Sequence, residues 1–268
     1  MKMKTRVLTV LFFSLVLSTS CKSQYQLMLE GHDVPGKYKM AFELFDAKKY
    51  LKAAALFDDL KIAVRGTPQD DTVQFYAAYC QYKYGDVYAA DQGFISFINA
   101  HPASPLTMRA HFMYVDCLYR QTYRYELDQT PTYKAINAIN EFTTYYPDNE
   151  WKLQCEKMLS DLKGRLDRKS FEAAKLYYTI EDYKAAAYAL RQALKEDNTN
   201  IYREEILYYL ALSSYKYAYN SIPQKARERY VIFTDDYFSF ITEYPDSKHR
   251  KELDALATKV QKLLDKKE

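Results

Sequence analysis

Hydrophobic positions along most of the chain recur at helical spacing, which predicts amphipathic helices separated by short polar turns. Three of these helices end in the same phrase, a Phe five residues before a Pro, with Ser or Asn two residues beyond that Pro. The phrases begin at Phe97, Phe142 and Phe240. A helix tends to stop at the residue before proline, and a Ser or Asn side chain caps the helix that follows. Each phrase therefore predicts a joint between two helices.

One interval between prolines equals the period of a helical repeat, since Pro68 lies 34 residues before Pro102. Small residues let the two helices of a hairpin approach, and large ones fill the gap to the next hairpin. Three segments carry such residues at matching places: Ala41, Leu44, Tyr50, Ala53 and Phe57; Ala78, Gly85, Ala90, Phe94 and Phe97; Ala174, Tyr177, Tyr183, Ala186 and Leu190. The pattern resembles the tetratricopeptide repeat. This resemblance implies an all-α, right-handed superhelix of about five repeats, the third and fifth being irregular.

The N-terminus has the three parts of an export signal. Basic residues precede an apolar run from residue 7 to residue 17, and small residues then lead to Cys21. The run is too short to span a bilayer. It resembles a bacterial lipoprotein signal, which implies cleavage before Cys21 and acylation of that cysteine with fatty acids such as palmitate. Lys22 favours the outer membrane by the same resemblance, and an ordinary secretory cleavage is the alternative.

These features give four predicted regions. Residues 1–20 form the signal peptide, and residues 21–36 form a lipidated tether. Residues 37–147 hold repeats 1–3. Residues 148–268 hold a linking helix and repeats 4–5, with a long helix that starts after Pro147 and runs into Tyr177.

Composition argues against a nucleic-acid-binding protein. Removing Lys2, Lys4 and Arg6 with the signal leaves 35 basic residues, equal to the 35 acidic ones. A mature chain without net charge lacks the general basic footprint of such proteins. The 28 tyrosines instead suit a helical stack that uses one residue type both for its core and for its surface.

Candidate chemistry is sparse. The four histidines are isolated, and no zinc spacing, glycine-rich phosphate loop or nucleophile elbow occurs. Neighbouring carboxylates such as Asp58 and Asp59 do not face one another on a helix. We therefore expect no enzyme, no cofactor and no metal site. Besides Cys21 the chain has three cysteines. They are either three buried thiols, or Cys80 and Cys117 form a disulfide.

The candidate binding surface lies on the first helices of the N-terminal repeats, which line the concave face in tetratricopeptide stacks. Its aromatic residues would stack on the side chain of an extended peptide, and its cations would meet a carboxylate. The residues proposed to bind peptide are Tyr38, Phe42, Phe75, Tyr79, Tyr82, Lys83 and Arg109, with Phe45, Met113 and Asp116 beside them. The alternative for any one of these aromatic residues is that it only fills the interior.

The chain resembles the BamD family, which are lipoproteins of the outer-membrane β-barrel assembly machinery. The resemblance rests on the number of repeats, the phrases at Phe97 and Phe240, the cysteine at position 21 and the long helix after Pro147. The resemblance covers about residues 37–264. It implies that the N-terminal repeats recognise the C-terminal signal of unfolded barrel proteins. It also implies that the C-terminal repeats dock a BamA-like barrel protein, with Arg191 and Tyr209 as candidate contacts, and that the protein faces the periplasm from the outer membrane. The basic contact residue of some relatives aligns with Ala189.

The sequence is also compatible with two other functions. A tetratricopeptide lipoprotein that organises peptidoglycan or captures glycan would use tyrosines and Trp151 to stack on sugars. A soluble periplasmic chaperone would require that Cys21 is not acylated.

Overall fold

The structure is a computed structural model that describes residues 23–265. The predicted signal peptide and Cys21 lie outside the described residues. Within the described range all regular structure is helical, and the chain divides into two compact units between Gln121 and Thr122. No helix in this range is long and apolar enough to cross a membrane.

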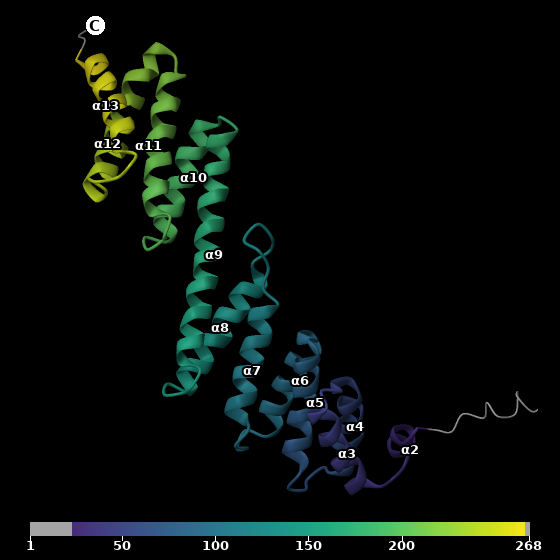
Figure 1. The fold of residues 1–268 in the computed structure, drawn as a ribbon. Helices are drawn as coiled ribbons and strands as arrows, with labels where there is room; N and C mark the ends of the chain where they lie inside the picture. The colour runs from purple at the N-terminus through teal and green to yellow at the C-terminus, as the bar shows by residue number, and fades with distance from the viewer. Residues whose placement is uncertain (1–22, 266–268) are drawn as a thin grey trace, which may run out of the picture. The chain divides into compact units, whose positions relative to one another are not determined.

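The N-terminal unit is a series of helices in which each packs on the next (Figure 1). The helices are α2 (Gln24–Glu30), α3 (Val34–Asp46), α4 (Tyr50–Ala63), α5 (Asp70–Tyr84), α6 (Val87–Ala100) and α7 (Thr107–Arg120). Helices α3 and α4 form the first predicted repeat, and α5 and α6 form the second. Helix α7 is the first helix of the third repeat.

The C-terminal unit contains α8 (Thr130–Tyr145), α9 (Lys152–Thr179), α10 (Tyr183–Glu196), α11 (Arg203–Tyr219), α12 (Pro223–Glu243) and α13 (Arg250–Leu264). The long helix expected after Pro147 is confirmed as α9, which contacts α8, α10 and α11. Because α8 packs on α9, the second helix of the third repeat belongs to this unit. The division between the units therefore falls inside the third repeat, whereas the sequence placed a boundary after residue 147.

The three Phe-Pro joints have the predicted construction. Helices α6, α8 and α12 each end just before the residue that precedes the proline, and the N–H of that residue donates to the carbonyl of the joint Phe. Phe97, Phe142 and Phe240 are buried. The capping side chains act slightly earlier than expected: the oxygens of Ser104, Asn149 and Ser247 accept from the N–H two residues ahead, in the turn before the helix proper.

The small residues of the repeat pattern are in the core, as predicted. Ala41 and Ala53 are buried between α3 and α4, and Ala78 and Ala90 are buried between α5 and α6. In the C-terminal unit, Ala186 packs with Phe171 and Leu190 in a core shared by α9, α10 and α11. These positions confirm the all-α fold of tetratricopeptide type.

The extra residues of the third repeat form a loop between residues 121 and 129. Lys169 of α9 donates to the carbonyl oxygens of Tyr125 at 3.1 Å and Leu127 at 2.7 Å, and Arg165 donates to the Thr122 hydroxyl at 2.9 Å. The loop is therefore held against α9 by two basic side chains.

Candidate functional site

The predicted peptide-binding residues of α3 and α5 form a continuous aromatic cluster in the N-terminal unit. The rings of Tyr38 and Phe42 lie 5.0 Å apart, and the ring of Phe45 lies 5.6 Å from that of Tyr79. Tyr79 and Tyr82 stack at 6.0 Å with only 15° between their planes. Contacts of this kind stabilise aromatic pairs beyond the area that they bury. The structure thus brings most of the predicted residues together.

Phe75 differs from the prediction. Its side chain is 0% exposed and packs against Phe94 and Phe97 of α6, with ring centroids 5.8 Å away in both cases. A residue so enclosed belongs to the core of the α5–α6 hairpin and does not offer its ring to a partner. Tyr79 is 9% exposed and offers little more than an edge. Tyr38, Phe42 and Tyr82 are half-buried and remain open to contact.

Two cations meet at the ring of Tyr79. The guanidinium of Arg109, on α7, lies 4.9 Å from the ring centroid and donates to the Tyr79 hydroxyl at 3.1 Å. The Lys83 Nζ lies 5.3 Å from the same centroid. Neither side chain forms an ion pair with any described residue. The tyrosine therefore holds two positive groups that have no carboxylate partner of their own.

A third cation close by is already neutralised. Arg120 forms an ion pair with Asp116 at 2.6 Å and also donates to the Tyr82 hydroxyl at 2.8 Å. That hydroxyl donates in turn to Asp116, which is 4% exposed. Burial, and then the hydrogen bond to Asp116, raise the pKa of the Tyr82 phenol, so it stays protonated and fixes Asp116 in place. The sequence did not single out Arg120, although it stands four residues after Asp116 on the same helix face.

In the C-terminal unit, the candidate docking residues Arg191 and Tyr209 face different neighbours. Arg191 of α10 pairs with Asp236 of α12 at 2.6 Å and donates to Ser214 of α11 at 3.4 Å. Burial raises the pKa of Asp236, although the contacts with Ser214 and Arg191 oppose that shift. Tyr209 is half-buried and packs on Tyr178 at 5.1 Å. No hydrogen bond or ring contact between described residues joins Arg191 to Tyr209.

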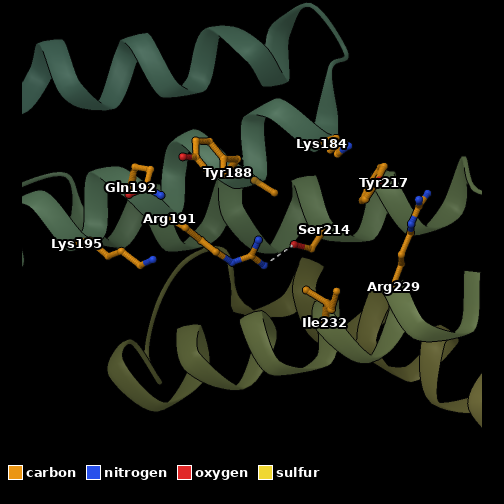
Figure 2. A pocket seen from close by; sticks show the side chains of 10 residues that line it. Lys184, Tyr188, Arg191, Gln192, Lys195, Ser214, Tyr217, Arg229 and Ile232 are labelled. Atoms are coloured by element: carbon orange, nitrogen blue, oxygen red, sulfur yellow. Dashed lines mark hydrogen bonds between the residues drawn. The ribbon is translucent and has the colours of Figure 1, made fainter. Parts of the chain in front are cut away.

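Arg191 lines a pocket of about 280 Å³ between α10, α11 and α12 (Figure 2). Four of its lining residues are cations, and none is acidic. The lining residues are Lys184, Ala187, Tyr188, Arg191, Gln192, Lys195, Ser214, Tyr217, Arg229 and Ile232. We call this the basic pocket. Its α10 members Lys184, Tyr188, Arg191 and Lys195 recur at helical spacing, and this pattern is visible in the sequence. Arg229 lies on α12, and no pattern in the sequence connects it with the others.

A second hollow, of about 430 Å³, lies between α9 and α10. Five alanines and two tyrosines account for most of its wall. The lining residues are Ser170, Ala173, Ala174, Tyr177, Ala185, Tyr188, Ala189, Gln192, Ala193 and Glu196. We call this the alanine groove, and it shares Tyr188 and Gln192 with the basic pocket.

Comparison with known proteins places the chain. Residues 33–231 match the YfiO family, described as outer membrane lipoprotein. The chain belongs to the YfiO family. A solved structure of a thermophilic tetratricopeptide protein from Thermus thermophilus, TTC0263, resembles the chain with 16% identity and a TM-score of 0.34, covering 85% of this chain and 98% of that one. No functionally curated protein matches the sequence.

The two hollows divide the residues that the sequence analysis considered for docking. Ala189 lines the alanine groove. Arg191 lies on the other side of the shared wall, in the basic pocket. The structure thus separates an apolar hollow from a charged one on the same helix.

The three cysteines that the structure describes are free and buried, so the possible bridge between Cys80 and Cys117 is not formed. Burial raises the pKa of both thiols to about 12, which leaves almost no reactive thiolate near neutral pH. Within residues 23–265, no group of three or more His, Cys, Asp or Glu is placed to hold a metal ion.

Proposed function

We propose that this YfiO-family lipoprotein is an assembly factor for outer-membrane β-barrel proteins, similar to BamD. It binds the C-terminal segment of an unfolded barrel chain with its N-terminal unit, docks a BamA-like barrel protein with its C-terminal unit, and acts by binding rather than by catalysis. The family match and the all-α repeat fold support this proposal. The observation that carries it is the pair of cations without carboxylate partners at the ring of Tyr79.

Peptide recognition would use both charge and aromatic surface. The guanidinium of Arg109 presents parallel N–H donors that match the two oxygens of a terminal carboxylate. The hydrogen bond from Arg109 to the Tyr79 hydroxyl holds the guanidinium in position before the peptide arrives. Less side-chain entropy is therefore lost when the peptide binds. The half-buried rings of Phe42 and Tyr82 would contact an aromatic side chain at the end of the peptide.

A peptide ending in Phe tests this mechanism. Its affinity for the full chain should be micromolar, or about 8 kcal/mol. Amidating its C-terminus removes the charge and should cost about 1.5 to 3 kcal/mol, the range for hydrogen bonds to charged groups. In an Arg109→Gln/Lys83→Gln double variant, the free and amidated peptides should bind equally.

The matched control is Lys39→Gln, because Lys39 is an exposed lysine of the same unit. This variant should keep the preference for the free carboxylate. Equal affinities of the two peptides for the unmodified protein would contradict the carboxylate contact. Binding of peptidoglycan fragments without any peptide binding would instead favour a glycan-capturing lipoprotein.

For the docking half of the proposal we favour the alanine groove and its rim. Two large exposed side chains line it: Tyr188 of α10 is 67% exposed and Tyr177 of α9 is 42% exposed, and the exposed Leu176 and Ile180 lie next in sequence on α9 and just after it. An apolar patch of this kind typically marks a protein interface. Arg191 would contribute from the neighbouring pocket, and Tyr209 would support α9 from beneath.

Copurification tests the docking surface. Tyr177→Ser/Tyr188→Ser should abolish recovery of the barrel protein from detergent-solubilised membranes while leaving peptide binding intact. Tyr133→Ser, at an exposed tyrosine of α8, is the control and should have no effect. Undiminished recovery with the double variant would exclude this surface.

A further inference from the structure

The basic pocket concentrates positive charge in a small volume. Lys184, Arg191 and Lys195 lie along one side of α10, and Arg229 approaches from α12 (Figure 2). Among residues 23–265, the carboxylate paired with these cations is that of Asp236, which is bound to Arg191 and does not line the pocket. Three of the four cations therefore have no ion-pair partner among the described residues.

The two arginines are held in position. Arg191 is fixed by Asp236 and Ser214. Arg229 donates to the Ser221 hydroxyl, and its guanidinium lies 3.9 Å from the ring centroid of Tyr217. Lys184 and Lys195 form no ion pair within the described part of the chain and are exposed. Two arginines held in place, with two exposed lysines that have no ion-pair partner in this part of the chain, can bind an anion without reorganising the fold.

We propose that this pocket binds the phosphate group of a phosphate monoester. A phosphate monoester carries a charge of about −1.5 to −2 at pH 7 and offers three strong acceptor oxygens, which matches several cations better than a single carboxylate does. Arginine is suited to this geometry because its planar fork donates two parallel hydrogen bonds.

The size and walls of the pocket fit the same ligand. About 280 Å³ accommodates a phosphate with a small organic group, but not a folded element of another protein. Ala187, Tyr188 and Ile232 provide apolar wall for that organic group. A soluble phosphate ester and the headgroup of a phosphate-bearing lipid share this chemistry.

The full, detergent-solubilised chain tests the proposal by calorimetric titration at fixed ionic strength. The probes are inorganic phosphate, glycerol 3-phosphate, and mixed micelles containing phosphatidic acid, with phosphatidylcholine micelles as the blank. Lys184→Gln/Lys195→Gln should weaken binding of the phosphate probe at least tenfold. Lys157→Gln/Lys251→Gln removes two exposed lysines of the same unit outside the pocket and should change the affinity less than twofold.

Binding of glycerol 3-phosphate would assign the pocket to soluble esters, and binding of phosphatidic acid micelles alone would assign it to a lipid headgroup. Both results support a phosphate site. Absence of binding at millimolar phosphate would overturn it, as would equal losses in the two double variants. Tighter binding of an oligoglutamate peptide than of every phosphate probe would also overturn it, in favour of an acidic protein segment.

Discussion

Gly93 of α6 lies directly against Ala78 of α5. A Cβ atom added to Gly93 would stand 2.7 Å from the Cβ of Ala78 and 3.2 Å from its Cα. Two helices can approach this closely only where one of them has no side chain. The contact sets the spacing of the hairpin that carries Tyr79 and Tyr82 on α5.

Gly93→Ala should therefore destabilise the protein, even though alanine is the better helix former by about 1 kcal/mol. Overpacking costs about 1 to 3 kcal/mol, so we expect a net loss of up to about 2 kcal/mol in the free energy of unfolding. Chemical denaturation followed by circular dichroism measures it. Gly164→Ala in α9 is the control: its Cβ would meet only the Ile201 side chain at 3.7 Å, so this variant should be neutral or more stable. A Gly93→Ala variant as stable as the control would contradict the close contact.

The contrast between these two glycines illustrates what the sequence predicts. The Phe-Pro joints follow from local chemistry, because proline stops a helix and Ser or Asn caps the next turn wherever they occur. The role of Gly93 depends on the distance to another helix, which no local pattern encodes. The sequence likewise placed Phe75 on the binding surface because helical spacing shows which residues share a face, but not how deeply α6 covers that face. Three cations of the basic pocket stand at helical spacing on α10, but no local pattern showed that Arg229 of α12 joins them.

In three repeats, the residue two positions before the second helix has a left-handed backbone conformation. Gly85 follows α5 with φ of 102°, and Lys48 and Glu181 follow α3 and α9 with φ of 58° and 64°. Side chains are disfavoured there by about 1 to 2 kcal/mol, whereas glycine is not, although glycine gains more freedom in the unfolded chain. Lys48→Gly and Glu181→Gly should each stabilise the protein by about 0.5 to 1 kcal/mol and so raise its melting temperature. Gly85→Ala should lower it. A fall in stability for both Lys48→Gly and Glu181→Gly would contradict the conclusion that these two positions are strained by their left-handed backbone.

The ion pair between Arg203 and Glu243 joins α11 to α12 and predicts a pH dependence. Arg203 donates to both carboxylate oxygens, at 2.7 and 2.8 Å, and these bonds hold the pKa of Glu243 below its ordinary value although burial opposes them. Stability from this pair is full above the pKa that Glu243 has in the unfolded chain. It is lost as the pH falls through the lower pKa of the folded state.

Glu243→Gln should consequently cost about 0.5 to 1 kcal/mol at pH 7, since the pair is partly exposed and screened by solvent. The difference from the unmodified protein should shrink as the pH falls below the ordinary glutamate pKa of about 4.3, and it should vanish below the lower pKa that Glu243 has in the folded protein. Urea denaturation at a series of pH values measures both. Glu228→Gln, at an exposed position on α12, should show no such trend. A cost that stays constant with pH would show that Glu243 acts through packing instead of charge.

Cys21→Ala should release the protein from the membrane. Several acyl chains anchor a protein stably, whereas one chain is marginal. Fractionation after a high-salt wash, followed by immunoblotting, gives the measurement. Cys155→Ala, at a buried cysteine, is the control and should remain with the membrane. A Cys21→Ala protein that still sediments with membranes would disprove the lipid anchor.

Arg109 and Arg120 provide the sharpest test of how the N-terminal unit would read a peptide. Both guanidiniums lie over a tyrosine ring, Arg109 at 4.9 Å from Tyr79 and Arg120 at 4.8 Å from Tyr82. Only Arg120 has a carboxylate partner, Asp116. Arg109→Gln should therefore reduce the preference for a free over an amidated peptide by about 1.5 kcal/mol or more, whereas Arg120→Gln should change it by less than about 0.5 kcal/mol.

The same reasoning predicts a gain in Asp116→Asn, which removes the charge but keeps an oxygen for the Tyr82 hydroxyl. Arg120 would then be free, and peptides with a terminal carboxylate should bind more tightly than they bind the unmodified protein. Titrations with free and amidated peptides, run on all three variants, measure this order. If Arg120→Gln weakened binding as much as Arg109→Gln, the ion pair between Arg120 and Asp116 would not determine which cation binds the peptide carboxylate.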